Sequence, residues 1–232
     1  AERQEVIVYT ALDQIYSEPV LKDFEKQTRI RVKAVYDIEA AKTTGLVNRL
    51  MAEKNNARCD VFWNNEIIKT ILLKRSRILT PYRSPSANNI PSQFKDALGY
   101  WTGFAARARV IVVNTDKTIN EMRSLSVFDL TRPEWKGRIA IANPLFGTTA
   151  THVSALFSVL GHHKAGQFFK DLKTNQIKVL DGNSVVRDRV GGGTVAAGFT
   201  DTDDVNMGVI NDMPIKAVFP DKNGMGTLLI PN

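Results

Sequence analysis

Apolar and polar positions in the first half of the chain alternate between the spacing typical of strands and that typical of helices. The strand pattern occurs at 6–9, 30–36 and 60–63. The helix pattern, with apolar residues three or four positions apart, occurs around 20–24, 47–51 and 67–72. This β-α-β-α-β-α order favours a mostly parallel sheet that is covered by helices on both faces.

The pattern changes after a segment rich in Pro, Ser and Asn at 81–91. The β-type run 101–115 is longer than most strands, so we expect it to leave one sheet and enter a second. A second α/β set follows, with strand patterns at 138–142, 177–180 and 195–199 and helix patterns at 148–160, 164–172 and 184–190. Two last β-type stretches, 215–219 and 226–230, are expected to return to the first sheet.

These patterns predict an α/β protein of two lobes joined by extended segments. The first lobe is expected to comprise 1–105 with 222–232 returning to it, and the second 106–221. A cleft between two lobes is a frequent place for a ligand.

Composition and charge narrow the classes of function. The 232 residues carry a net charge of +7, but the densest basic cluster, 69–77, alternates with apolar residues as a surface helix does. No nucleic-acid-binding motif accompanies it, so we expect no nucleic acid partner. No apolar run is long enough to span a membrane, and the single cysteine, Cys59, excludes an internal disulfide. The chain starts at Ala1 without an initiator Met, as a processed exported protein or a trimmed polypeptide would.

The most informative polar segment is 200–204, which carries three carboxylates directly after the apolar run 195–199. Crowded carboxylates repel one another unless a cation or several donors lie among them. Ligands in open α/β sheets bind at the carboxyl ends of strands, so this segment is a candidate site. The alternative is a solvated acidic turn in which Asp residues cap a helix.

A second candidate lies at 147–151, where Gly147 and three threonines begin a predicted helix. Free backbone N–H groups, the helix dipole and hydroxyls together favour a phosphate or carboxylate group there. The alternative is plain capping by one threonine. Asn183 and Ser184, at the next helix start, would add donors or act as a simple cap.

Several segments together resemble one known family over essentially the whole chain. These are 8–10, 59–66, 106–110, 135–140, 147–151, 183–185 and 226–232. The set is similar to the extracellular solute-binding proteins of ABC importers, in the branch that contains the bacterial ferric-iron-binding proteins. The resemblance implies a two-lobed periplasmic-binding-protein fold (type II, transferrin-like), a periplasmic or membrane-tethered extracellular location, and an importer permease as partner. It also implies further helices that complete the first lobe, and these helices are absent from this sequence.

The departures from that family concern the ligand. Ferric-binding relatives hold iron with phenolate, imidazole and carboxylate groups, and their Tyr-Tyr pair falls here on Asp203 and Asp204. The histidine of the first loop falls on or near Asp13, and a carboxylate falls on Asn65. Oxygen ligands of this kind suit a hard divalent cation, or the amine and hydroxyl groups of an organic molecule.

We therefore expect a monomeric receptor, not embedded in the membrane, that binds a phosphorylated or phosphonylated small molecule, or a metal ion with a synergistic anion. A ferric-iron or divalent-metal protein of an iron importer is the alternative. The anion side is expected to comprise Gly147, Thr148, Thr149, Thr151, Asn183 and Ser184. The acidic side is expected to comprise Asp13, Asn65, Asp203 and Asp204, with Asp13, Asp203 and Asp204 as metal ligands. Further candidates are Tyr9, Trp63, Asn64, Glu66, Asp201 and Arg107.

An enzyme is not expected, because the sequence has no nucleophile elbow, zinc-protease motif, P-loop or dinucleotide-binding glycine pattern. No catalytic residue or resident cofactor is assigned, and a metal ion with its anion would be the transported ligand. A hydrolase that uses Asp203 and Asp204 as a carboxylate pair is the alternative of a different class. The sensor domain of a receptor would share the fold.

Overall fold

The computed structural model describes residues 4–37, 43–117, 126–222 and 224–232. The chain divides into two compact units: unit 1 is Ala1–Ala106 with Pro231–Asn232, and unit 2 is Arg107–Ile230. The stretch 222–230, which the sequence patterns assign to the first lobe, is therefore part of unit 2. Both units are α/β, as the patterns predict.

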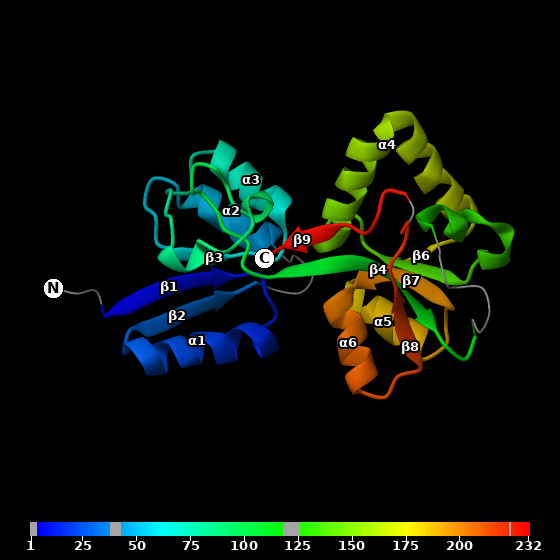
Figure 1. Cartoon of the computed structure of the whole chain (residues 1–232), viewed down its shortest axis with the longest axis horizontal. Coiled ribbons are helices and arrows are strands. Elements are labelled where there is room, and N and C mark those ends of the chain that lie inside the picture. Colours follow the sequence, from blue (N-terminus) through cyan, green and yellow to red (C-terminus); the bar gives the residue numbers. More distant parts are fainter. Residues whose placement is uncertain (1–3, 38–42, 118–125, 223) are drawn as a thin grey trace. The chain divides into compact units, whose positions relative to one another are not determined.

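Unit 1 is built on a parallel sheet of three strands in the order β2-β1-β3. Its elements are β1 (Glu5–Thr10), α1 (Gln14–Thr28), β2 (Arg31–Tyr36), α2 (Thr44–Ala52), β3 (Val61–Trp63) and α3 (Ile67–Arg75). Helices α2 and α3 lie on one face of this sheet and α1 on the other (Figure 1). The core between the sheet and α2 and α3 contains Tyr9, Leu50 and Leu73. The predicted β-α-β-α-β-α order is thus confirmed.

Unit 2 is built on a mixed sheet in the order β6-β5-β7-β4-β8, with β9 also paired to β4. Its elements are β4 (Ala106–Asn114), β5 (Ile139–Ala142), α4 (Gly147–Thr174), β6 (Lys178–Leu180), α5 (Asn183–Gly191), β7 (Ala197–Asp201), α6 (Thr202–Ile210), β8 (Ile215–Val218) and β9 (Leu229–Pro231). Helix α4 lies on one face of this sheet, and α5 and α6 lie on the other (Figure 1).

Side chains of β4 alternate between the two hydrophobic cores of unit 2. Ile111 and Val113 belong to the core that includes Phe168 of α4. Val110 and Val112 belong to the core that includes residues of α5 and α6. This alternation decides which polar residues of β4 share a face, because successive side chains of a strand point to opposite faces.

Two expectations about the elements are corrected by the structure, and a third is confirmed. The strand expected at 101–115 begins only at Ala106, because Gly103 N–H bonds back to Phe94 O at 2.8 Å and Phe104 N–H bonds to Asn232 O at 3.0 Å. The stretches expected to return to the first sheet instead form β8 and β9, which pair with β4. The two helices expected at 148–160 and 164–172 are both present within α4, because the backbone at Gly161, with φ 76°, is not helical and separates them.

Within the described residues, every helix is too short or too polar to serve as a membrane span.

Candidate functional site

Two arginines of β4 face two aspartates at the end of β7. The antiparallel register sets Arg109 directly opposite Asp201, and Arg109 Nη1 donates to Asp201 Oδ1 at 2.7 Å. Arg107 lies two residues earlier and therefore on the same face. Its Nη1 is 3.0 Å from Asp203 Oδ2 and 3.7 Å from Asp201 Oδ2. An Arg-Ala-Arg segment is thus matched in charge to an Asp-Thr-Asp segment.

The pair of Arg109 and Asp201 is the buried centre of a polar network. Their side chains are 1% and 0% exposed. Thr148 of α4 donates its hydroxyl to Asp201 Oδ2 at 2.6 Å, and Asn183 Nδ2 donates to the same oxygen at 2.9 Å. Arg109 Nη2 approaches the hydroxyl of Thr149 at 3.5 Å. A buried ion pair needs such additional hydrogen bonds, because removing two charges from water is costly.

This network includes two threonines of the expected anion side, whose contact with an anion stays a prediction. The hydroxyls of Thr148 and Thr149 point into the network, and both residues are buried. The N-cap residue of helix α4 is Phe146, and no side-chain hydrogen bond caps the helix there. Capping is therefore not the role of these threonines. The groups available to an anion at this place would be the first backbone N–H groups of α4, because the first N–H groups of any helix have no partner within it. Gly147 has φ 54°, and no heavy atom lies within 4 Å of the position a Cβ would take.

The three aspartates at the junction of β7 and α6 form one cluster. Asp201, Asp203 and Asp204 each offer an oxygen, and these oxygens lie within 4.8 Å of one another. Burial, followed by the negative charges of Asp203 and Asp201, raises the pKa of the Asp204 carboxyl from 3.8 to about 7. Thr200 donates its hydroxyl to Asp204 Oδ2 at 3.1 Å. Asp201 precedes α6 but makes no side-chain cap bond, so the capping alternative is wrong for this residue.

The charge that the crowded carboxylates need comes from within the chain. Arg107 and Arg109 carry two positive charges against Asp201 and Asp203, and Asp204 is close to half protonated at neutral pH. A positive partner was expected among these acids, and two guanidinium groups fill that role. The sequence signal was the two-residue spacing of arginines in one strand and of aspartates at the end of another.

One further polar group of α4 is buried beside this network. His152 packs its ring against Phe199 with centroids 5.7 Å apart. Burial, and secondarily the charge of Arg109, lowers the pKa of His152 to about 3. The imidazole is therefore neutral at physiological pH.

The unit 1 candidates lie where β1 and β3 end. Asn65 Nδ2 donates to Ala11 O at 3.1 Å, and Thr43 donates its hydroxyl to Asn65 Oδ1 at 3.0 Å. Thr43 also approaches Asn64 Oδ1 at 3.2 Å. Sequence reasoning missed Thr43, which is buried and has φ 69°, a rare conformation for a β-branched residue. These contacts tie together loops at the carboxyl edge of the parallel sheet.

The remaining unit 1 candidates differ in their surroundings. Asp13 occupies the residue before α1 and is exposed. Glu66 is buried and accepts the backbone N–H groups of Ile68 and Lys69, so it caps α3. Tyr9, one of the further candidates, lies in the unit 1 core, and its hydroxyl donates to Glu53 at 2.9 Å. The proposed convergence of Asp13 and Asn65 with the acids of unit 2 stays a prediction.

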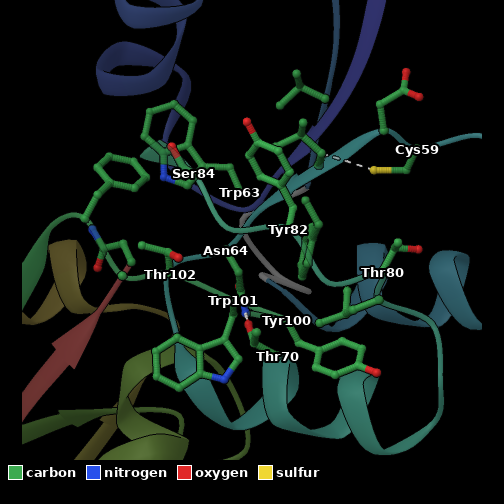
Figure 2. Close-up of a pocket in the computed structure, with 18 of the residues that line it drawn as sticks. Cys59, Trp63, Asn64, Thr70, Thr80, Tyr82, Ser84, Tyr100, Trp101 and Thr102 are labelled. Carbon is green, nitrogen blue, oxygen red and sulfur yellow. Dashed lines mark hydrogen bonds between the residues drawn. The ribbon is translucent and has the colours of Figure 1, made fainter. Parts of the chain in front are cut away.

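Unit 1 also contains an apolar cavity of about 660 Å³. It lies against the sheet face that α1 covers, and residues of the stretch 78–104 also line it (Figure 2). Trp63 lines it and packs on Phe104 with ring centroids 5.5 Å apart. Cys59 lies at its edge, where burial raises the pKa of the thiol to about 11. This lining contrasts with the charged network of unit 2, which is the stronger candidate for a polar ligand.

The chain is similar to known bacterial proteins over most of its length. A model of the bacterial extracellular solute-binding protein family matches residues 70–201, more than half of the chain. The Fe(3+)-binding periplasmic protein of Serratia marcescens is 29% identical over 195 residues, which are 84% of this chain and 56% of that protein. The chain spans about half the length of the curated relatives it matches.

Solved structures show the same fold. The apo ferric ion-binding protein A of Pasteurella haemolytica superposes with a TM-score of 0.87 at 25% identity, covering 98% of this chain and 72% of that one. A periplasmic binding protein from Actinobacillus pleuropneumoniae with fructose-6-phosphate bound gives a TM-score of 0.83 at 23% identity, with coverage of 98% and 72%. The fold expected from the motifs, a type II periplasmic binding fold, is thus confirmed.

Proposed function

We propose, for a chain that belongs to the bacterial extracellular solute-binding protein family, that it is the substrate-binding component of an ABC-type importer in the periplasm. Its ligand is a hard metal cation held together with an anion, and ferric iron is the first candidate. The names of the relatives support this ligand, since they include the Fe(3+)-binding protein of Serratia marcescens. The relatives therefore favour the iron alternative over the phosphorylated small molecule that was the first expectation.

The observation that carries the proposal is the convergence of carboxylate oxygens within 4.8 Å at the end of β7. Asp201 is already saturated by Arg109, Thr148 and Asn183. Asp203 and Asp204 are therefore the two groups of unit 2 that would bind the cation. Oxygen ligands of this kind match the preference of hard cations.

The anion would bind at the start of α4. The backbone N–H groups that begin at Gly147 and the positive end of the helix dipole favour negative charge there. Asn183 holds Asp201 and approaches both Thr148 and Thr149, so its role is to fix the network beneath this helix start. A ligand contact by Ser184 or Thr151 stays a prediction.

A phosphorylated small molecule is the second candidate, and one observation favours it. Arg107 and Arg109 already balance the charges of Asp201 and Asp203, which lowers the need for a bound cation. The Actinobacillus pleuropneumoniae protein of the same fold holds fructose-6-phosphate. In this case the phosphate would bind at the start of α4, and Asp203 and Asp204 would accept hydroxyl groups.

The family is one of binding proteins, so we propose capture and delivery to an importer permease rather than turnover. The carboxylate-pair hydrolase has no support among the relatives, whose names describe binding and uptake. A monomeric state remains part of the proposal.

Calorimetric titration of the metal-free protein tests the choice of ligand. Ferric citrate and fructose-6-phosphate are added in separate experiments to the wild type, to an Asp203→Asn/Asp204→Asn double variant, and to Asp188→Asn. Asp188 is an exposed carboxylate of the same unit and serves as the matched control. We expect ferric binding to be lost in the double variant and kept in the control. Binding of fructose-6-phosphate alone would favour the second candidate, and binding of neither would contradict both.

A further inference from the structure

We propose that Arg107 is an exchangeable internal cation: its guanidinium occupies the place of the ligand cation in the empty site and must leave Asp203 before a cation binds. This inference rests on the proposed function and adds a residue that decides cation selectivity. It also separates the roles of two arginines that share one face of β4.

Arg109 is fixed in place. Its guanidinium bonds to Asp201, Asn183 and the hydroxyl of Thr148, and its side chain is 1% exposed. Moving it would break several buried hydrogen bonds at once and leave Asp201 with an uncompensated buried charge, which is strongly destabilising. Arg109 is therefore part of the scaffold in any ligand state.

Arg107 is held by fewer contacts. A single nitrogen, Nη1, approaches Asp203 and Asp201, and the side chain is 12% exposed. Within the described residues, the buried Nε of Arg107 has no hydrogen-bond partner, and neither has that of Arg109, so the two arginines differ in the bonds of their Nη groups. An arginine offers five N–H donors, so Arg107 uses little of its capacity. Its guanidinium leaves when the ion pair with Asp203 and the longer approach to Asp201 are broken, which an incoming cation at Asp203 would compensate.

The position of Arg107 makes it a competitor for the cation. Its nearest carboxylate, Asp203, is one of the two groups proposed to bind the metal ion, and the oxygens of Asp203 and Asp204 lie within one 4.8 Å cluster. A cation bound to these oxygens would lie beside the guanidinium, and like charges at that separation repel strongly where water is partly excluded. In the empty site the guanidinium of Arg107 is thus the positive partner of Asp203, and only a cation that binds these oxygens more strongly than the guanidinium displaces it.

The test compares Arg107→Gln with wild type, using gallium(III) citrate as a redox-inert, diamagnetic probe for a hard trivalent cation. Calorimetry should show about tenfold tighter binding in Arg107→Gln, which corresponds to about 1.4 kcal/mol. Arg107→Lys keeps the charge and should bind within about threefold of wild type on the same scale. Arg132→Gln is the matched control, because Arg132 is an exposed arginine of unit 2, and its affinity should be unchanged.

A second measurement does not depend on the variants folding. The Nε–H signal of Arg107 in wild-type protein, assigned by NMR, should shift when gallium(III) citrate is added, while that of Arg109 should stay in place. An unmoved Arg107 signal in a gallium-bound protein would overturn the inference. Weaker binding by Arg107→Gln would also overturn it, because Arg107 would then anchor the anion.

The outcomes separate this inference from the proposed function. Wild-type binding of gallium with equal affinity in Arg107→Gln leaves the metal function standing and refutes the role of Arg107. Binding by Arg107→Gln but not by wild type supports the internal cation and refutes metal transport by the natural protein. No binding by either protein refutes both.

Discussion

Replacing Asp204 by asparagine should stabilise the empty protein at alkaline pH and change its stability little at acidic pH. Folding raises the pKa of this carboxyl from 3.8 to about 7, through burial and then the charges of Asp203 and Asp201. A group with a raised pKa favours the folded state while it is protonated. Its contribution is therefore complete below about pH 4 and is lost as the pH rises through about 7.

The magnitude follows from the pKa shift. Each pKa unit corresponds to 1.36 kcal/mol, so the shift of Asp204 corresponds to about 4 kcal/mol at most. The residue is partly exposed, and solvent screening lowers the expected difference between variant and wild type at pH 8.5 to about 2 kcal/mol. An asparagine can still accept the hydrogen bond from Thr200, so the substitution removes the charge and little else.

Urea unfolding at several pH values between 4.5 and 8.5 measures this effect. The free energy of unfolding of Asp204→Asn should exceed that of wild type by an amount that grows as the pH rises. Asp188→Asn makes the same chemical change at an exposed carboxylate whose ion-pair partner among the described residues is its neighbour Arg187. The free energy of unfolding of this variant should differ little from that of wild type at every pH. A difference between Asp204→Asn and wild type that does not vary with pH would refute the reasoning.

Three further predictions concern the same unit. Gly147→Asp and Gly147→Asn share the same backbone cost at φ 54°. Calorimetry should therefore show weaker anion binding for the aspartate variant than for the asparagine variant, and equal affinities of the two variants would mean that no anion binds at this helix start. Asp201→Ala should lower the free energy of unfolding by about 3–5 kcal/mol, because it leaves Arg109 buried and unpaired; a loss below about 1 kcal/mol in urea would contradict the buried pair. The imidazole of His152, with a pKa of about 3, should show no protonation by NMR between pH 5 and 8, and a midpoint near the ordinary 6.5 would contradict its burial.

The order of elements could be read from the sequence where apolar spacing is unambiguous. The alternation at 30–36 and the helical spacing around 47–51 each mark one face of an element, and β2 and α2 form there. The start of β4 could not be read in this way. Apolar residues from Trp101 onward continue the strand pattern, but the backbone N–H groups of Gly103 and Phe104 are taken by Phe94 and Asn232.

The charged site was found in part. The carboxylates at 201–204 mark a strand end, and that position was read correctly. Their counter-ions depend on the register between β4 and β7, which sets Arg109 opposite Asp201, 92 positions later in the chain. Spacing alone made Arg107 a further candidate without identifying its partner, and the antiparallel pairing places it beside Asp203. No sequence pattern pointed to Thr43, because what distinguishes this residue is its backbone conformation, with φ 69°.

Native mass spectrometry combined with metal analysis tests the central proposal most directly. The protein is stripped of ligand, exposed to ferric citrate and phosphate, exchanged into volatile buffer and weighed intact. We predict one iron ion and one anion per chain, and their loss in the Asp203→Asn/Asp204→Asn double variant. A metal-free protein after this treatment, or iron retained equally by the double variant, would contradict the assignment of these carboxylates as the cation site.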